Sequence, residues 1–544
     1  MDASTRFDTQ IVGGLPVIAK YLDQLQVADT IDRLVPWEGK VPLGTVIEVM
    51  IINRLLAPTP LFRLGEWADR AGVAAYYGLR GSQLNDDLLG RGLERIQAHV
   101  DPVQSDLVLH AVRGWKVDVA EVHYDITTAE LYGAYDSTTP EGQTPPSPQP
   151  TYGRTKSGRK HVKQIQVGVT VTGDGGVPVA HVPLDGNTAE ASTHIPNMRR
   201  LAQLLGRSDL LFIGDTKQDS KDTLLEAKAG GGEFLCGGVF SPDAQQYFLR
   251  HRRKLRPVAY WPKSQDKLPA QERDRYEAFE RTDRLAGTVA GRKIKFTYRT
   301  IFVWSEAKAR QEAQTRERHV LKVRAEFDKV QSNLNRYTLK TRDAIVKRLE
   351  LAKAKYSEGK LFSYTLTENK GRFSLHWRVD PKALQQWQAL EGVYLLKASP
   401  SSRRLPVVKA LAKYKEQSKV ERRIHYLKGP LAVTPMFLEK PERMAGLLCV
   451  LLWALLVLTL MERAVRTSLK GQPLYGLYPE NRPSPAPTGP SILRAFNTLC
   501  IIIIKHRGAV TRRLAQPDAT QQMLLRHLGI ASNELRAFKR RCGL

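Results

Sequence analysis

The chain has 544 residues, with 83 Lys and Arg against 55 Asp and Glu, so its formal net charge is +28. That excess favours a nucleic-acid partner, DNA or RNA, and the length exceeds what one hydrophobic core serves, so several domains are expected. The 4 cysteines lie far apart in no paired spacing, which argues against structural zinc and indicates a reduced, cytoplasmic protein. The first residues lack the apolar core of a signal peptide.

Residues 1–115 are expected to form a helical N-terminal domain. Apolar residues recur near every 3.6 positions in Leu15–Leu25, Leu43–Leu56, Leu61–Ala71 and Leu88–His99. Arginines on or beside these helices favour a helix-turn-helix-like reader of DNA ends. A helical packing or dimerisation module fits the same pattern, so both interpretations stay open.

Two aspartates follow strand-like runs in residues 116–240. Asp125 is expected at the end of a short β-type run, and Asp215 directly follows the apolar run Leu210–Gly214, which is typical of a buried strand. Between them, a Gly-Asp-Gly-Gly turn predicts a hairpin. The other expected elements are strands at 164–172 and 177–183, a helix at 191–205, a helix at 220–229 and a strand at 233–236.

The segment between Asp125 and the hairpin contains two contrasting stretches. Asp136–Pro150 is rich in Pro, Ser and Thr, which is typical of a flexible loop. The basic run at 152–160, which includes Lys156 and Arg159, follows it. That run either grips a DNA phosphate or is an exposed basic loop without a fixed contact.

Residues 241–390 are interpreted as an insertion domain. Tyr247–Lys267 is basic and aromatic, which suits backbone tracking and base stacking on a single strand. Ala307–Lys355 has a long, highly charged helical pattern with an apolar seam, and Leu361–Val379 alternates like a hairpin. A dimer contact is an equal alternative for the charged helix.

Residues 391–470 combine a strand-like run, a charged helix and an apolar helix. Glu391–Leu396 reads as a strand. Met444–Met461 carries no charge over 18 residues, long enough for a membrane span, but a helix packed inside a large core has the same composition and is favoured. The tail at 471–544 is first Pro-rich and later basic, with Cys500–Ile504 expected to be a buried strand.

The charged helix is expected to run from Pro406 to the residue before Gly429. Tyr414, Gln417, Glu421 and Lys428 stand at offsets of 0, 3, 7 and 14, so all four fall on one stripe of a helix. An acid between a phenol and an ammonium suits a carboxylate that binds a metal ion while its neighbours hold phosphate. A solvated charged face is the alternative.

The order of these elements matches the RNase H-like fold, and the stripe resembles the Tyr-x2-Arg-x3-Glu-x6-Lys signature of bacterial insertion-sequence DDE transposases. Three of the four signature positions match, and Gln417 stands where the signature has Arg. The phrases Val177-Pro178 with LDGNTAEAST, the strand before the Glu helix and the aliphatic helix after ERMAG also resemble that family. The resemblance extends from about 119 to 463.

The resemblance implies an α/β fold with an RNase H-like mixed-sheet core. Residues 116–240 and 391–470 would form that core, interrupted by the insertion domain at 241–390. The helical domain at 1–115 would precede it, and the tail at 471–544 would follow.

The resemblance also implies a DNA transposase that cleaves element ends and transfers the strand into target DNA. Two Mg²⁺ or Mn²⁺ ions would be held by Asp125, Asp215 and Glu421. The partners would be the terminal inverted repeats, target DNA and a second copy of the chain, with no membrane. The residues expected to contact DNA are Tyr414, Gln417, Lys428, Lys217, Lys156 and Arg159. An RNase H-like nuclease without strand transfer and an inactive DNA-binding relic are the alternatives.

Overall fold

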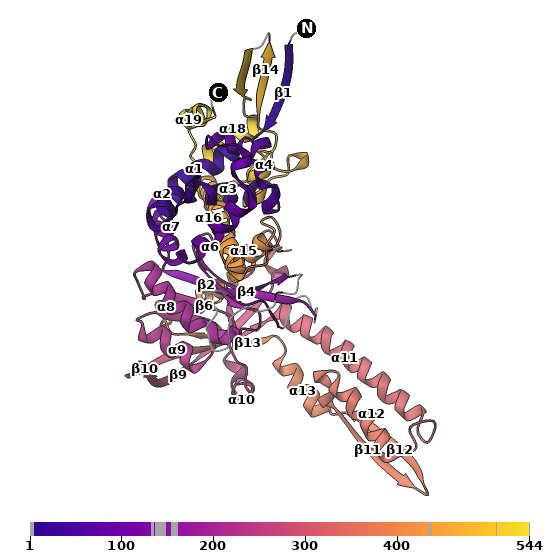
Figure 1. Cartoon of the computed structure of the whole chain (residues 1–544). Coiled ribbons are helices and arrows are strands. Elements are labelled where there is room, and N and C mark those ends of the chain that lie inside the picture. Colours follow the sequence, from indigo (N-terminus) through magenta and orange to yellow (C-terminus); the bar gives the residue numbers. More distant parts are fainter. Residues whose placement is uncertain are drawn as a thin grey trace. The chain divides into compact units, whose positions relative to one another are not determined.

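The computed structural model describes residues 5–131, 135, 148–153, 161–433, 436, 438–506 and 509–542 (Figure 1). Two compact units make up the chain. Unit 1 comprises residues 1–234, 289–292 and 415–544, and unit 2 comprises residues 235–288 and 293–414. The boundaries therefore fall inside the segments that the sequence assigns to the core.

A mixed β-sheet lies at the centre of unit 1. Among the described residues, five strands of the ten-stranded sheet lie wholly within this unit: β2 (Glu121–Leu131), β3 (Thr151–Tyr152), β4 (Lys163–Thr172), β5 (Pro178–Asp185) and β6 (Leu211–Gly214). Strand β4 pairs antiparallel with β2 on one side and with β5 and β3 on the other, whereas β6 runs parallel to β2. An antiparallel meander whose first strand pairs with a parallel fourth strand is the RNase H-like arrangement, so the expected α/β fold class is confirmed.

The local chemistry explains these elements. The β4–β5 turn needs Gly175 and Gly176, whose φ angles of 77° and 65° are unfavourable for other residues. The crossover to β6 is η3 (Glu190–Thr193) and α8 (His194–Leu205), and β6 is followed by η4 (Thr216–Gln218), α9 (Lys221–Ala229) and β7 (Glu233–Gly238). The predicted hairpin, helices and strands of this segment are confirmed, with ends shifted by a few residues.

The apolar helix α16 (Pro441–Leu469) forms the core around which the helices of unit 1 pack. It contacts α1, α3, α6, α7, α15, α17 and α18 as well as strand β5. It is long and apolar enough to cross a membrane, but its most apolar 18-residue window is 100% buried inside the structure. The backbones of α16 and α6 approach closely, because a Cβ on Gly446 would lie 2.2 Å from Leu93 O. The expected buried core helix is thus observed.

The N-terminal part is helical, as predicted. Its helices are α1 (Leu15–Leu25), α2 (Val27–Leu34), α3 (Leu43–Leu56), α4 (Leu64–Arg70), α5 (Val73–Tyr76), α6 (Asp86–Gln97) and α7 (Val100–Trp115), with the short turns η1 (Leu61–Arg63) and η2 (Gly81–Gln83). Helix α3 is buried on nearly all sides. A helix surrounded by protein cannot enter a DNA groove, so α3 serves as core.

The two ends of the chain meet in a small three-stranded sheet. Strand β14 (Cys500–His506) lies between β1 (Thr5–Ile11) and β15 (Ala509–Leu514), antiparallel to both. The strand expected at 500–504 is confirmed, but its burial is not. Ile501 is buried while the next three isoleucines are partly exposed. The tail also contains η9 (Pro479–Asn481), α17 (Gly489–Arg494), α18 (Ala519–His527) and α19 (Ser532–Arg541).

Unit 2 combines an antiparallel sheet with long helices. Its elements are α10 (Pro242–His251), η5 (Arg252–Lys254), β8 (Arg256–Val258), η6 (Lys263–Gln265), η7 (Ala270–Glu272), β9 (Tyr276–Val289), β10 (Arg292–Ser305), α11 (Glu306–Ser332), α12 (Arg342–Ala354), η8 (Ser357–Leu361), β11 (Phe362–Asn369), β12 (Arg372–Val379), α13 (Pro381–Leu390), β13 (Val393–Ala398) and α14 (Val407–Lys415). The predicted hairpin at 361–379 and the strand before the Glu helix are confirmed. The single charged helix expected over 307–355 is wrong, because a turn separates α11 from α12.

The Glu helix also differs from the expectation. The single helix predicted from 406 to 428 is two helices, α14 and α15 (Ser418–Lys428), separated at Glu416 and Gln417. There the backbone tightens, since Lys419 N donates to Glu416 O at 2.8 Å and Val420 N to Gln417 O at 3.1 Å. These bonds span three residues, as in a 3₁₀ turn.

Candidate active site

Asp125 lies on β2, and Asp215 directly follows β6, the parallel neighbour of β2. The paired register of β2 and β6 ends with His123 opposite Ile213. Extended by two residues, it brings Asp125 opposite Asp215, whose own backbone is still extended, with φ −78° and ψ −168°. Parallel neighbours lie about 4.8 Å apart and paired side chains share a face, so the extended register predicts both carboxylates on one side of the sheet.

The two aspartates are positioned differently within their strands. Asp125 lies inside β2, which continues to Leu131, so the expectation of a strand end is wrong. Its Oδ1 accepts a hydrogen bond from Ile126 N at 2.8 Å. Asp215 follows β6 directly, as predicted, and caps η4 by accepting from Lys217 N at 2.8 Å. The Lys217 side chain is exposed beside it.

Helix α15 covers the face of β2 that carries Asp125. Gln417, at the start of this helix, donates through Nε2 to Tyr124 O at 3.0 Å, and its Oε1 lies 3.2 Å from His123 Nδ1. His123 and Asp125 are two residues apart on one strand, so their side chains point to the same face. Gln417 therefore fixes α15 on the backbone beside Asp125.

A buried ionic network also holds α15 against α16 and against the turn between β4 and β5. Arg423 donates to Gly176 O at 3.0 Å and to Glu462 Oε1 of α16 at 2.9 Å. Glu462 Oε2 also accepts from Tyr426 OH at 3.0 Å, and Arg466 lies 2.8 Å from Oε1. Burial disfavours the Glu462 carboxylate, but Arg423 and Arg466 outweigh it and hold the pKa of Glu462 below its usual value.

Glu421 lies at the edge of the packed face of α15. Val420, Ile424 and Leu427 are buried on that face, whereas Glu421 is exposed in the first turn. It follows Gln417 by four residues, about one helical turn. In the part of the chain that the structure describes, no cation forms an ion pair with Glu421 or Asp215.

Two buried groups next to the aspartates are held neutral. Burial lowers the pKa of His194, at the start of α8, and the charge of Asp215 offsets this only in part. Burial raises the pKa of Tyr124 to about 12, although its hydroxyl donates to Thr193 Oγ1 at 3.0 Å. At neutral pH, therefore, His194 and Tyr124 carry no charge, and the charge in this region comes from the carboxylates.

A polar cluster that the sequence did not reveal lies beside Gln417. Oxygen or nitrogen atoms of Glu121, His123 and Glu416 lie within 4.8 Å of one another, close enough to bind a metal ion. His123 Nε2 is 3.3 Å from Glu121 Oε1, and Lys419 Nζ pairs with Glu416 Oε2 at 2.8 Å. These side chains already contact one another or Lys419, so the cluster serves to hold α15 against β2. No motif spacing in the sequence connects these residues.

The structure does not bring all the predicted DNA-contacting residues together. Tyr414 belongs to unit 2, where its ring stacks on Tyr394 with centroids 6.5 Å apart. Lys428 lies in the last turn of α15. Gln417 is engaged with β2. Lys156 and Arg159, with most of the Pro-rich segment, lie outside the described residues.

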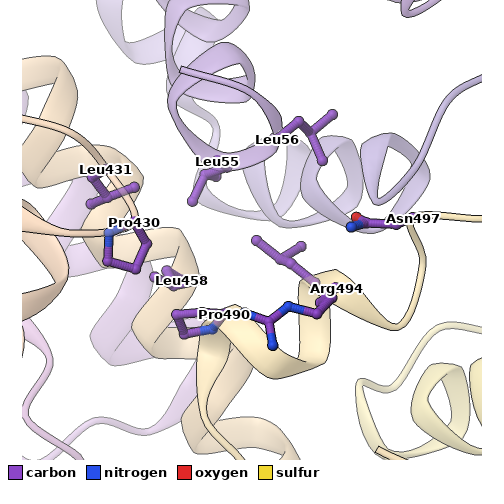
Figure 2. A pocket seen from close by; sticks show the side chains of 9 residues that line it. Leu55, Leu56, Pro430, Leu431, Leu458, Pro490, Arg494 and Asn497 are labelled. Carbon is purple, nitrogen blue, oxygen red and sulfur yellow. The ribbon is translucent and has the colours of Figure 1, made fainter.

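A small cavity lies elsewhere in unit 1, between α3, the end of α15, α16 and α17 (Figure 2). Its volume is about 150 Å³. Its lining residues are Leu55, Leu56, Pro430, Leu431, Leu458, Pro490, Leu493, Arg494 and Asn497. With no carboxylate among them, this pocket is not a second acidic site.

A family model matches part of this chain, and a solved structure is similar to it. A family model described as a domain of unknown function (DUF4277) matches residues 7–104, the N-terminal helical part. No curated protein matches the chain. Among solved structures, the chain is similar to the piggyBac transposase synaptic complex with hairpin DNA, with 7% identity, 98% of this chain and 87% of that chain covered, and a TM-score of 0.34.

Proposed function

We propose that this protein is a DDE-type DNA transposase of an insertion sequence, which cleaves DNA at element ends and joins the freed end to target DNA. The β2–β6 register supports this most, because extended by two residues it brings Asp125 opposite Asp215, while Gln417 fixes the helix of Glu421 to β2. The signature-like spacing around Glu421 adds to it.

The three carboxylates fit divalent cations. Their donor atoms are all oxygens, which Mg²⁺ and Mn²⁺ prefer, and Asp215 and Glu421 have no cationic partner among the described residues. Asp125 and Asp215 would hold one ion, and Asp125 and Glu421 a second. Bound there, two ions would activate the attacking oxygen and stabilise the leaving one.

The rest of this region positions those carboxylates. The bonds of Gln417 and Arg423 fix the position of α15 and therefore that of Glu421 relative to β2. Lys217 and Lys428 would attract DNA phosphate as flexible point charges. The net charge of +28 favours a DNA partner in general, and DNA ends held by two copies of the chain complete the proposed complex.

Two other functions share this site. A nuclease on the same fold would cleave DNA without joining it, and an inactive relic would bind DNA without cleaving. Each differs from the proposal in one measurable step.

The test uses purified protein, a duplex carrying an element end, Mg²⁺ and a target plasmid. Asp125→Asn, Asp215→Asn and Glu421→Gln should each abolish cleavage while leaving DNA binding largely intact, because an amide is a much weaker ligand for a hard cation. Asp222→Asn, on the neighbouring helix α9, is the matched control and should cleave normally. Cleavage without joining would identify the nuclease, and binding without cleavage the relic. Near-normal cleavage by a triad variant would remove that residue from the site.

A further inference from the structure

A second candidate site lies in a groove of unit 1, here named the Arg54 groove. It lies between the end of α3, the segment that follows it, the first residue of α6, described residues between 432 and 440, and the start of α16, with a volume of about 730 Å³. That volume is in the range of pockets that hold ligands of nucleotide size. The lining residues that matter below are Arg54, Thr59, Phe62, Asp86, Arg443 and Leu447.

Arg54 is a buried cation without a counter-charge. Only 9% of it is exposed. Within the described ranges no carboxylate pairs with it, and its Nη2 donates only to Thr59 O, at a long 3.4 Å. Burial lowers the pKa of this guanidinium. A buried charge is normally paired, so the arrangement favours an anion from outside the chain.

The surroundings of Arg54 are preorganised. Asn53 is fully buried, and its Nδ2 donates to Ala57 O and to Thr59 Oγ1, both at 2.9 Å. Its Oδ1 accepts from Thr59 N at 3.2 Å. These bonds fix the chain after α3 and hold Thr59 O against the guanidinium. The other two cations in the lining, Lys440 and Arg443, already pair with Glu94, at 3.0 and 2.7 Å.

The walls of the groove present an apolar and aromatic surface. Phe62 is 72% exposed, an unusual position for a large apolar side chain. Leu447 and the prolines at 58 and 60 belong to the apolar lining, together with Leu61, Ala432, Val433, Met436 and Leu438, and two carboxylates, Asp86 and Glu439, add acceptors. The neighbouring Leu55 lines the other cavity instead (Figure 2). Arg54 therefore supplies the one buried cation among the lining residues, and Phe62 the exposed aromatic ring.

We propose that the Arg54 groove binds one nucleotide unit, with its phosphate on Arg54 and its base against Phe62. An aromatic face stacks on any base, and a guanidinium donates two parallel hydrogen bonds to a phosphate. An exocyclic amine of the base would donate to Asp86. The choice of a nucleotide rests on the proposed DNA-related function, and the unit is either part of an unpaired strand or a free nucleotide.

The experiment measures binding to the full chain by calorimetry, without any cleavage readout. The probes are deoxyadenosine 5′-monophosphate, deoxyadenosine, inorganic phosphate and a single-stranded decanucleotide. The monophosphate should bind more tightly than either of its parts. Phe62→Ala and Arg54→Lys should each weaken its binding about tenfold, because one removes stacking and the other the planar fork. Arg63→Ala, an exposed cation next to Phe62 and outside the groove, should bind within about twofold of the wild type.

The outcomes separate the two sources of the nucleotide. Displacement of the monophosphate by the decanucleotide assigns the groove to an unpaired strand, and failure to displace it assigns the groove to a free nucleotide. Phe62→Ala keeps the fold because its side chain is exposed, so unchanged binding in that variant overturns the proposal, as does absent binding of both nucleotide probes. Asp125→Asn should bind like the wild type, so the loss of the proposed catalytic function would leave this result unaffected.

Discussion

Replacing Glu462 by Gln should strongly destabilise unit 1. The carboxylate is 1% exposed and accepts from Arg423, Tyr426 and the Gly489 amide at 2.9, 3.0 and 2.9 Å. Removing its charge leaves the Arg423 guanidinium, 3% exposed, without a counter-charge. Breaking a buried pair in this way costs about 3–5 kcal/mol.

Part of that penalty is offset at Arg466, whose side chain is 26% exposed and can regain water. The lower end of the range, about 3 kcal/mol, is therefore expected. For a cooperative unit of several hundred residues this corresponds to a fall in Tm of about 3–6 °C. The contribution of Glu462 to the free energy of unfolding also depends on pH. Because the folded pKa of Glu462 lies below its ordinary value of 4.5, the contribution is present above pH 4.5 and is lost as the pH falls through the folded pKa.

The assay is differential scanning calorimetry of the full chain at neutral and acidic pH, with the transitions of the two units resolved. The matched control is Glu66→Gln, because Glu66 is 58% exposed and pairs with Arg70 at 3.4 Å. An exposed pair contributes at most about 1 kcal/mol, so the Tm of the Glu66→Gln variant should stay close to that of the wild type. Equal shifts in the two variants, or a Glu462→Gln transition that matches the wild type at neutral pH, would refute the buried network as the anchor of α15.

Three other perturbations have defined outcomes. Gln417→Arg restores the family signature but removes the Oε1 that faces His123 Nδ1 and puts a longer, charged side chain at the bond to Tyr124 O, so it should lower the cleavage rate. A faster rate than the wild type would contradict the placement of Gln417. Burial raises the pKa of Glu48 to about 7, so the folded state holds the extra proton and stability falls as pH rises from 4.5 to about 7. Glu48→Gln should flatten that slope in calorimetry, and an unchanged slope would place the proton elsewhere. DNA affinity should fall about a thousandfold between 50 and 200 mM salt if roughly six phosphates are neutralised, as measured by fluorescence anisotropy, and a flat response would assign the basic excess another role.

The sequence predicted those parts of the core whose signals are local. The run before Asp215 is continuously apolar, and the Gly-rich turn between β4 and β5 requires positive φ angles. Both patterns can be interpreted without knowledge of distant residues. The resemblance to the transposase family then predicted that these strands form an RNase H-like sheet, and the observed strand pairing agrees.

The remainder depended on contacts between residues far apart in the chain. The turn between α11 and α12 contains neither Gly nor Pro, and Asn335 adopts a φ of 63° while its side chain donates to Phe373 O at 2.9 Å. Likewise the helix break at Gln417 is accompanied by a bond to Tyr124, 293 residues earlier. No local pattern marks either partner, so periodicity alone extended both helices too far.

The hairpin of β9 and β10 was missed for a related reason. Over much of both strands, exposed and half-buried residues alternate, and charged side chains occupy many of the positions. A strand without a strongly apolar face resembles a charged loop by composition. In the proposed site, the same dependence on tertiary structure explains why the cluster of Glu121, His123 and Glu416 was not foreseen.

Anomalous diffraction from crystals of the protein soaked in Mn²⁺ tests the central claim most directly. The account predicts density within about 2.0–2.6 Å of carboxylate oxygens of both Asp125 and Asp215, with Glu421 near the same or an adjacent peak. The strongest peak lying instead among Glu121, His123 and Glu416, or no peak in contact with Asp125 and Asp215, would contradict it.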